Sequence, residues 1–144
     1  VEYRIIKPHP NFRFFATGNT NGVGDETGLY QGTQMGNAAN FSRFGMTIEM
    51  GYMPPKMEAI VVSNQSSCSV EDAEKIVEFC TAVRKAYGAR QIGSTISPRE
   101  AINTAILSLA RANWRAGLER AYLARCSRVD RQMIDQFAQR IWGN

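Results

Sequence analysis

Three polar side chains stand where residue type and setting could support chemistry. Asn19 follows the aromatic run FRFFAT, at the end of a predicted strand. Arg43 lies in FSRF, directly before a second predicted strand, and Arg99 lies in SPRE at the start of a predicted helix. An amide can orient a water or a phosphate oxygen, and an arginine binds phosphate through charge-assisted hydrogen bonds. Each also has an ordinary interpretation: a turn residue for Asn19 and a surface cation for the arginines.

The setting of Arg99 is the most informative of the three. Ser97 is predicted as an N-cap, Pro98 as the first helical residue and Glu100 as the closing member of a capping box. A cation in the first helical turn is disfavoured by the helix dipole, by a few tenths of a kcal/mol. The same position is well suited to holding an anion between the helix end and the guanidinium. On physical grounds alone, an anion site and a surface arginine are equally good interpretations of Arg99.

The sequence contains few residues that could form other kinds of site. His9 is the only histidine, and the three cysteines Cys68, Cys80 and Cys126 are scattered and odd in number. We therefore expect no metal site and no disulfide, and we interpret the cysteines as reduced thiols. No phosphate loop of the form G-x-x-x-x-G-K-[ST] occurs. The run GVGDETG is one residue off the dinucleotide fingerprint, and no suitable helix is predicted after it.

Charge is unevenly distributed along the chain. Residues 1–83 carry six basic and nine acidic side chains, whereas residues 84–144 carry eleven and four. A basic C-terminal half indicates a phosphate-rich or acidic partner, or simply a solvated arginine surface. On charge alone, we favour the solvated surface. No apolar run approaches the roughly 18 residues that a membrane span needs.

Hydrophobic spacing predicts an α/β part followed by an all-α part. Alternating or aromatic-rich segments indicate strands at residues 1–5, 11–17 and 46–52, with a glycine-rich loop and a short helix of residues 37–44 between the last two. The long connection favours parallel pairing of these strands. From Pro55 onward the periodicity is helical, at 56–64, 70–88, 98–110, 115–125 and 129–142. We therefore place a domain boundary between 1–54 and 55–144.

Taken together, the three residues resemble the pattern of the AAA+ ATPases, in particular the MoxR-like branch. That pattern is a strand ending in A-T-x-N, an x-x-R-F before the next strand, and S-P-R-E opening a lid helix. The resemblance implies that Asn19 is the sensor-1 residue, Arg43 the arginine finger and Arg99 the sensor-2 residue. In such proteins the sensor-1 amide positions the attacking water.

Within that branch, residues 8–44 look most like the small AAA+ subunit of aerobic cobaltochelatase. The shared run is H-P-x-F-R-x-F-A-T-x-N-T followed by G-x-G-D-x-T-G-L-Y-x-G-T-Q. One position departs from the family, because Ser42 stands where an aspartate usually precedes the finger arginine. From residue 55 onward the resemblance rests on SPRE and the helical pattern.

The resemblance implies the C-terminal part of an AAA+ module, a remnant of a parallel sheet plus a helical lid. The phosphate loop and the magnesium ligands would lie upstream of Val1, which fits a start without Met in a predicted strand. The expected protein is a cytoplasmic ATPase that binds Mg-ATP between the subunits of a homo-oligomeric ring, commonly a hexamer. It would remodel a client protein or a chelatase subunit, with cobalt chelation as the implied output. This chain alone is expected to be inactive.

The alternative from another class is a non-enzymatic binding module, a basic helical domain that docks on nucleic acid or on an acidic protein. We expect nucleic acid to be bound poorly, because Trp114, Tyr122 and Trp142 fall on or near apolar faces rather than forming a stacking platform. A stand-alone enzyme is disfavoured, since nothing in this sequence could hold a nucleotide or a metal alone.

Overall fold

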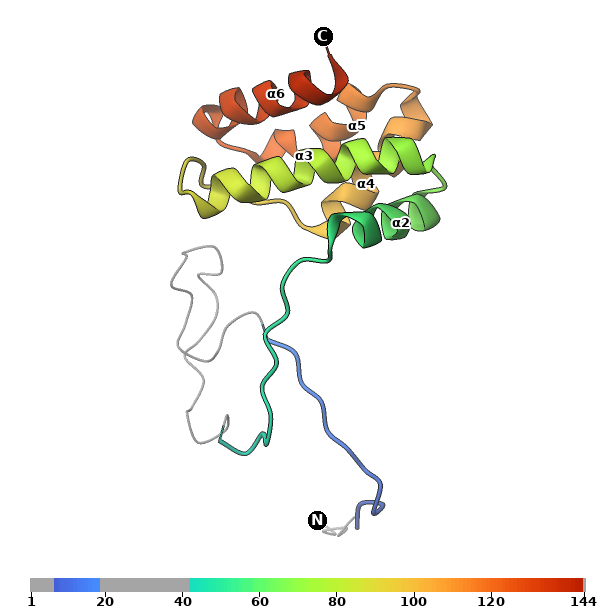
Figure 1. The fold of residues 1–144 in the computed structure, drawn as a ribbon, viewed down its shortest axis with the longest axis vertical. Coiled ribbons are helices and arrows are strands. Elements are labelled where there is room, and N and C mark those ends of the chain that lie inside the picture. Colours follow the sequence, from blue (N-terminus) through green and yellow to red (C-terminus); the bar gives the residue numbers. More distant parts are fainter. Residues whose placement is uncertain (1–6, 19–41, 144) are drawn as a thin grey trace, which may run out of the picture. The chain divides into compact units, whose positions relative to one another are not determined.

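The computed structural model describes residues 7–18 and 42–143. It divides the chain into two compact units, Val1–Met50 and Gly51–Asn144. All the helices among the described residues belong to the second unit (Figure 1). The domain boundary predicted at residues 54 and 55 stays a prediction.

The described parts of the first unit contain no β-strand. Residues 12–18 and 44–50 run as irregular, exposed chain, and Met46, Ile48 and Met50 are 68 to 85% exposed. An alternating segment becomes a strand only when its backbone pairs with a neighbour and one face is covered. Neither condition is met within the described residues, so the structure does not show the α/β part of the predicted fold. The predicted strand at 1–5 lies outside the described residues, as does most of the short helix at 37–44.

The helical unit confirms the predicted all-α part. Its elements are α2 (Pro55–Ser66), α3 (Val70–Gly88), α4 (Pro98–Arg111), α5 (Trp114–Ala121), the 3₁₀-helix η1 (Leu123–Arg125) and α6 (Arg128–Trp142). The helix predicted at 115–125 is therefore two elements, because the backbone leaves helical geometry at Tyr122, with φ −138° and ψ −55°.

Local caps explain where these helices begin. Pro55 starts α2, where its missing N–H costs nothing. The Ser69 hydroxyl accepts from the Asp72 N–H at 3.0 Å at the start of α3, and Asn113 caps α5 in the same way. The Ser127 hydroxyl accepts from the Asp130 N–H at the start of α6, at 3.1 Å. Residues in the connections between the helices therefore determine where these helices begin.

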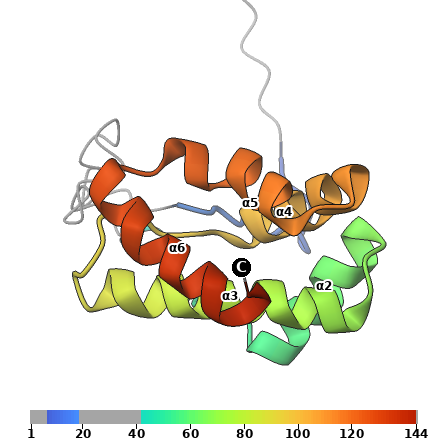
Figure 2. The ribbon, with the colours of Figure 1, turned by 90° about the horizontal axis from the view of Figure 1, so that it is seen from above.

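The core forms around α3, which packs against α2, α4 and α6, while α4 packs against α5. Figure 2 shows α4 and α5 together on one side of α3. Phe79 on α3 is fully buried, and its ring lies 5.6 Å from that of Trp142 and 6.4 Å from that of Tyr122. Trp142 also stacks on Trp114, with centroids 4.7 Å apart. The predicted placement of these aromatics against the core is confirmed.

The three cysteines lie in the helical unit. All three are free thiols, and Cys80 is fully buried on the apolar face of α3. Burial raises the pKa of Cys80 to about 12, which keeps the thiol protonated as a small hydrophobic side chain.

Candidate functional site

Arg99 is exposed in the first turn of α4, next to a capping box that the structure confirms. The Glu100 carboxylate accepts from the Ser97 backbone N–H at 2.7 Å and also from the Ser97 hydroxyl. Because Pro98 fixes its own φ, the start of this helix is defined within one residue. Arg99 forms no ion pair with any residue that the structure describes. Its guanidinium is therefore presented to solvent at the positive end of a helix.

The carboxylate of Glu100 is held by donors from two residues, Ser97 and Arg125. Arg125 from η1 forms an ion pair with Glu100 at 2.6 Å. Burial works against ionisation of Glu100, but hydrogen bonds from Ser97 and Arg125 outweigh it and lower the pKa of Glu100. Glu100 is thus occupied by the cap and by Arg125. An anion such as a phosphate suits Arg99 at this helix end.

Arg43 belongs to the first unit, where it is exposed in a turn of residues 42–43. Together with Phe14, Phe44 and Gly45 it lines an open hollow of about 500 Å³. The rings of Phe14 and Phe44 lie 5.8 Å apart. Arg43 therefore lies beside aromatic residues, and the hollow offers room for a ligand group beside the guanidinium.

Asn19 lies outside the described residues. Arg43 and Arg99 lie in separate units. The structure therefore does not test whether the three predicted residues share one site, and their roles stay predictions.

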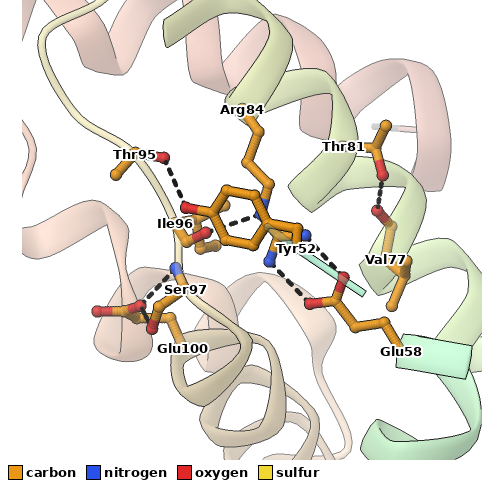
Figure 3. Close-up of polar contacts among 9 residues, drawn as sticks. All are labelled: Tyr52, Glu58, Val77, Thr81, Arg84, Thr95, Ile96, Ser97 and Glu100. Atoms are coloured by element: carbon orange, nitrogen blue, oxygen red, sulfur yellow. Dashed lines mark hydrogen bonds and ion pairs between the residues drawn. The ribbon is translucent and has the colours of Figure 1, made fainter. Parts of the chain in front are cut away.

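A buried ion pair that the sequence analysis missed lies beside α4. The two terminal nitrogens of Arg84 donate to the two carboxylate oxygens of Glu58 at 2.7 Å each, and Arg84 Nε donates to the Ile96 carbonyl at 2.9 Å (Figure 3). The Glu58 side chain is 1% exposed and that of Arg84 10%. The Tyr52 ring covers the guanidinium, with its centroid 3.8 Å from the Arg84 Cζ atom.

The sequence did carry a signal for this pair. Arg84 falls at helical spacing on the same face as Val77, Cys80 and Tyr87, so the apolar stripe of α3 contains a cation. A charge on a buried face needs a partner. Burial works against the charge of Arg84, but the hydrogen bond to Glu58 outweighs it and raises the pKa of Arg84.

Among residues 7–18 and 42–143, no group of histidine, cysteine and acidic side chains could hold a metal ion. No helix in the described part of the chain is long and apolar enough to cross a membrane.

Comparisons with known proteins support the class that the motifs predicted, a protein related to the AAA+ ATPases. The chain is 31% identical over 145 residues to the aerobic cobaltochelatase subunit CobS of Sinorhizobium sp.. The match covers 97% of this chain and 44% of that protein, so the chain spans less than half the length of its curated relative. The predicted resemblance to the small AAA+ subunit of aerobic cobaltochelatase is confirmed. No family model matches the chain. No solved structure matches it significantly.

Proposed function

We propose that this chain is the C-terminal portion of a ring-forming AAA+ ATPase that couples ATP hydrolysis to remodelling of a partner in cobalt chelation. The observation that carries the proposal is the similarity to a cobaltochelatase subunit, which extends over nearly the whole chain. The exposed Arg99 at a confirmed capping box supports it, because a lid that contacts phosphates needs a cation at such a helix end. The partner would be another chelatase subunit.

In this proposal the two predicted domains have different tasks. Residues 1–54 would complete an α/β ATPase core, with Asn19 positioning the attacking water and Arg43 reaching the γ-phosphate of a neighbouring subunit. Residues 55–144 would form the helical lid, from which Arg99 contacts phosphates within its own subunit. Mg-ATP would bind mainly through residues that precede this chain. Action in the cytoplasm is part of the proposal and fits the three free thiols.

A comparison of two proteins tests the ATPase part of the proposal. The full-length protein should release phosphate from Mg-ATP in the steady state, whereas residues 1–144 alone should release none above the buffer blank. The expected difference follows because, in this proposal, the triphosphate cradle and the magnesium ligands lie outside these residues. Turnover by residues 1–144 alone, after exclusion of contaminating ATPases, would contradict the proposal, and so would an inactive but folded full-length protein.

The cobalt part needs its own measurement. The full-length protein should support ATP-dependent insertion of cobalt by the chelatase when it is combined with the other chelatase subunits. ATP hydrolysis without any contribution to insertion would keep the ATPase assignment and reject the chelation assignment.

A further inference from the structure

The loop that leads into α4 is anchored at its first half by α6. The Asp130 carboxylate accepts from the Gly93 N–H at 3.1 Å and from the Ser94 hydroxyl at 2.8 Å. Asp130 is 8% exposed and lies in the first turn of α6. A loop of glycine and small polar residues has many accessible conformations. These contacts therefore restrict a segment that would otherwise move freely.

The second half of the loop is anchored by the buried pair. Arg84 donates to the Ile96 carbonyl at 2.9 Å, and the Tyr52 hydroxyl lies 3.4 Å from Thr95 Oγ1 (Figure 3). All three nitrogens of Arg84 have partners, two of them on Glu58, and Tyr52 covers its face. Arg84 is consequently not free to bind a phosphate. It can act on a ligand only through the backbone that it holds.

We propose that Arg84, with Glu58 and Tyr52, is a positioning residue for Arg99. Ile96 directly precedes the capping box, so the carbonyl that Arg84 holds lies three residues before Arg99 on a chain that Pro98 stiffens. A shift of the Ile96 carbonyl would move the start of α4 and, with it, the guanidinium of Arg99. The proposal rests on the proposed function, because it gives Arg99 a phosphate to contact.

The test uses the full-length protein and measures the dissociation constant and the turnover number for Mg-ATP. Arg84→Met and Tyr52→Leu should each weaken ATP binding several-fold and should lower turnover by up to about 100-fold for a displacement near 1 Å. Lys75→Met is the matched control, because Lys75 pairs with Glu71 on the exposed side of the same helix. It should leave both constants unchanged.

A double-mutant cycle separates positioning from general destabilisation. If Arg84 acts through Arg99, then Arg84→Met should weaken ATP binding less than about twofold further in an Arg99→Ala background. A merely structural contribution would instead add its full effect in that background. Additive losses would therefore overturn the proposal, as would unchanged ATP binding in folded Arg84→Met protein.

A second variant covers the case in which Arg84→Met does not fold, and Arg99→Ala separates failure of the positioning role from failure of the proposed function. Loss of Arg84 leaves the Glu58 carboxylate buried without its partner, so Arg84→Met can fail to fold. In that case the double-mutant cycle with Arg99→Ala is made with Tyr52→Leu instead. Tyr52 is half exposed, and its replacement leaves the Glu58–Arg84 ion pair intact. If Arg99→Ala itself leaves ATP binding unchanged, the phosphate-contacting role of Arg99 in the proposed function fails as well. If Arg99→Ala weakens binding but Arg84→Met and Tyr52→Leu do not, only the positioning role fails.

Discussion

Arg84 lies before the loop that connects α3 and α4, and Arg99 lies after it. The two arginines are in opposite environments. Each guanidinium nitrogen of Arg84 donates a hydrogen bond inside the protein, two to a carboxylate and one to a backbone carbonyl. Arg99 is exposed and pairs with none of the described acidic residues. A buried arginine must be satisfied internally, whereas an exposed one at a helix N-terminus retains its donors for an external anion. The setting thus separates a structural arginine from a candidate ligand-binding one.

Replacement of Arg99 by alanine should weaken binding of Mg-ATP to the full-length protein. A hydrogen bond to a charged group contributes about 1.5–3 kcal/mol, so the dissociation constant should rise roughly ten- to a hundredfold. Equilibrium titration with nucleotide measures this. Arg111→Ala is a suitable control, since Arg111 is exposed in the last turn of the same helix. Equal effects of the two variants would indicate general electrostatics rather than a contact of Arg99.

At the scale of elements, the helices were predictable from the sequence because their signals are local. SPRE marks a helix start through residues within one turn, and this prediction is confirmed. The strand predictions depended on partners far along the chain, which spacing alone does not supply. The Glu58–Arg84 pair joins two helices, so only the misplaced cation on the apolar face of α3 hinted at it.

Glu100 should make the stability of the helical unit depend on acid pH. Its folded pKa lies below the ordinary value of 4.5, so the stability that its carboxylate supplies is present above about pH 4.5. That contribution is lost as the pH falls through the lower, folded pKa. Chemical denaturation of residues 1–144 between pH 3 and 7 should therefore show a shallower acid decline for Glu100→Gln, which starts from a lower plateau.

The control for this measurement is Glu74→Gln, which removes one carboxylate from the exposed surface of α3. Parallel pH curves for Glu100→Gln and the unchanged protein would contradict the role given to the capping box and to Arg125.

Close packing of α4 against α5 gives a second prediction at this scale. A Cβ atom at Gly117 would lie 2.5 Å from the backbone nitrogen of Ser108, a distance that requires the helices to separate. Gly117→Ala should therefore lower the free energy of unfolding by about 1–3 kcal/mol, the usual cost of overpacking. Gly88→Ala, where a Cβ meets nothing within 4 Å, is the matched control and should not destabilise. Thermal or denaturant unfolding of the two variants tests whether α4 and α5 lie as close together at Gly117 as they do in the structure.

At the scale of the whole molecule, the aromatic rings of the basic C-terminal half lie against the core of the helical unit. Tyr122 is 3% exposed, and Trp114 and Trp142 stack on each other against the core. Several of its arginines pair with carboxylates, as in Arg115–Asp135 and Arg131–Glu119. Single-strand binding surfaces instead expose aromatic rings beside unpaired cations. The rings of this half are therefore not placed to stack on bases, and poor binding of nucleic acid stays a prediction.

The role of Arg43 can be tested only in the assembled protein, because a finger acts on the nucleotide of a neighbour. Arg43→Ala in the full-length protein should leave ATP binding nearly unchanged and lower turnover on the order of 10³-fold, since the finger contacts charge that develops in the transition state. Arg99→Ala should differ by weakening binding as well as turnover. Steady-state kinetics together with equilibrium binding separates the two patterns.

Mixed rings show whether Arg43 acts in trans. Subunits carrying Arg43→Ala are combined with subunits whose phosphate loop is inactivated, so that neither population alone is active. Junctions that join an intact finger to an intact phosphate loop should recover part of the turnover, in proportion to their statistical abundance. Ring mixing is verified independently, by exchange of differently labelled subunits. If mixed rings form and no activity returns, Arg43 does not reach the neighbouring nucleotide, and its place beside Phe14 and Phe44 then indicates a local packing role.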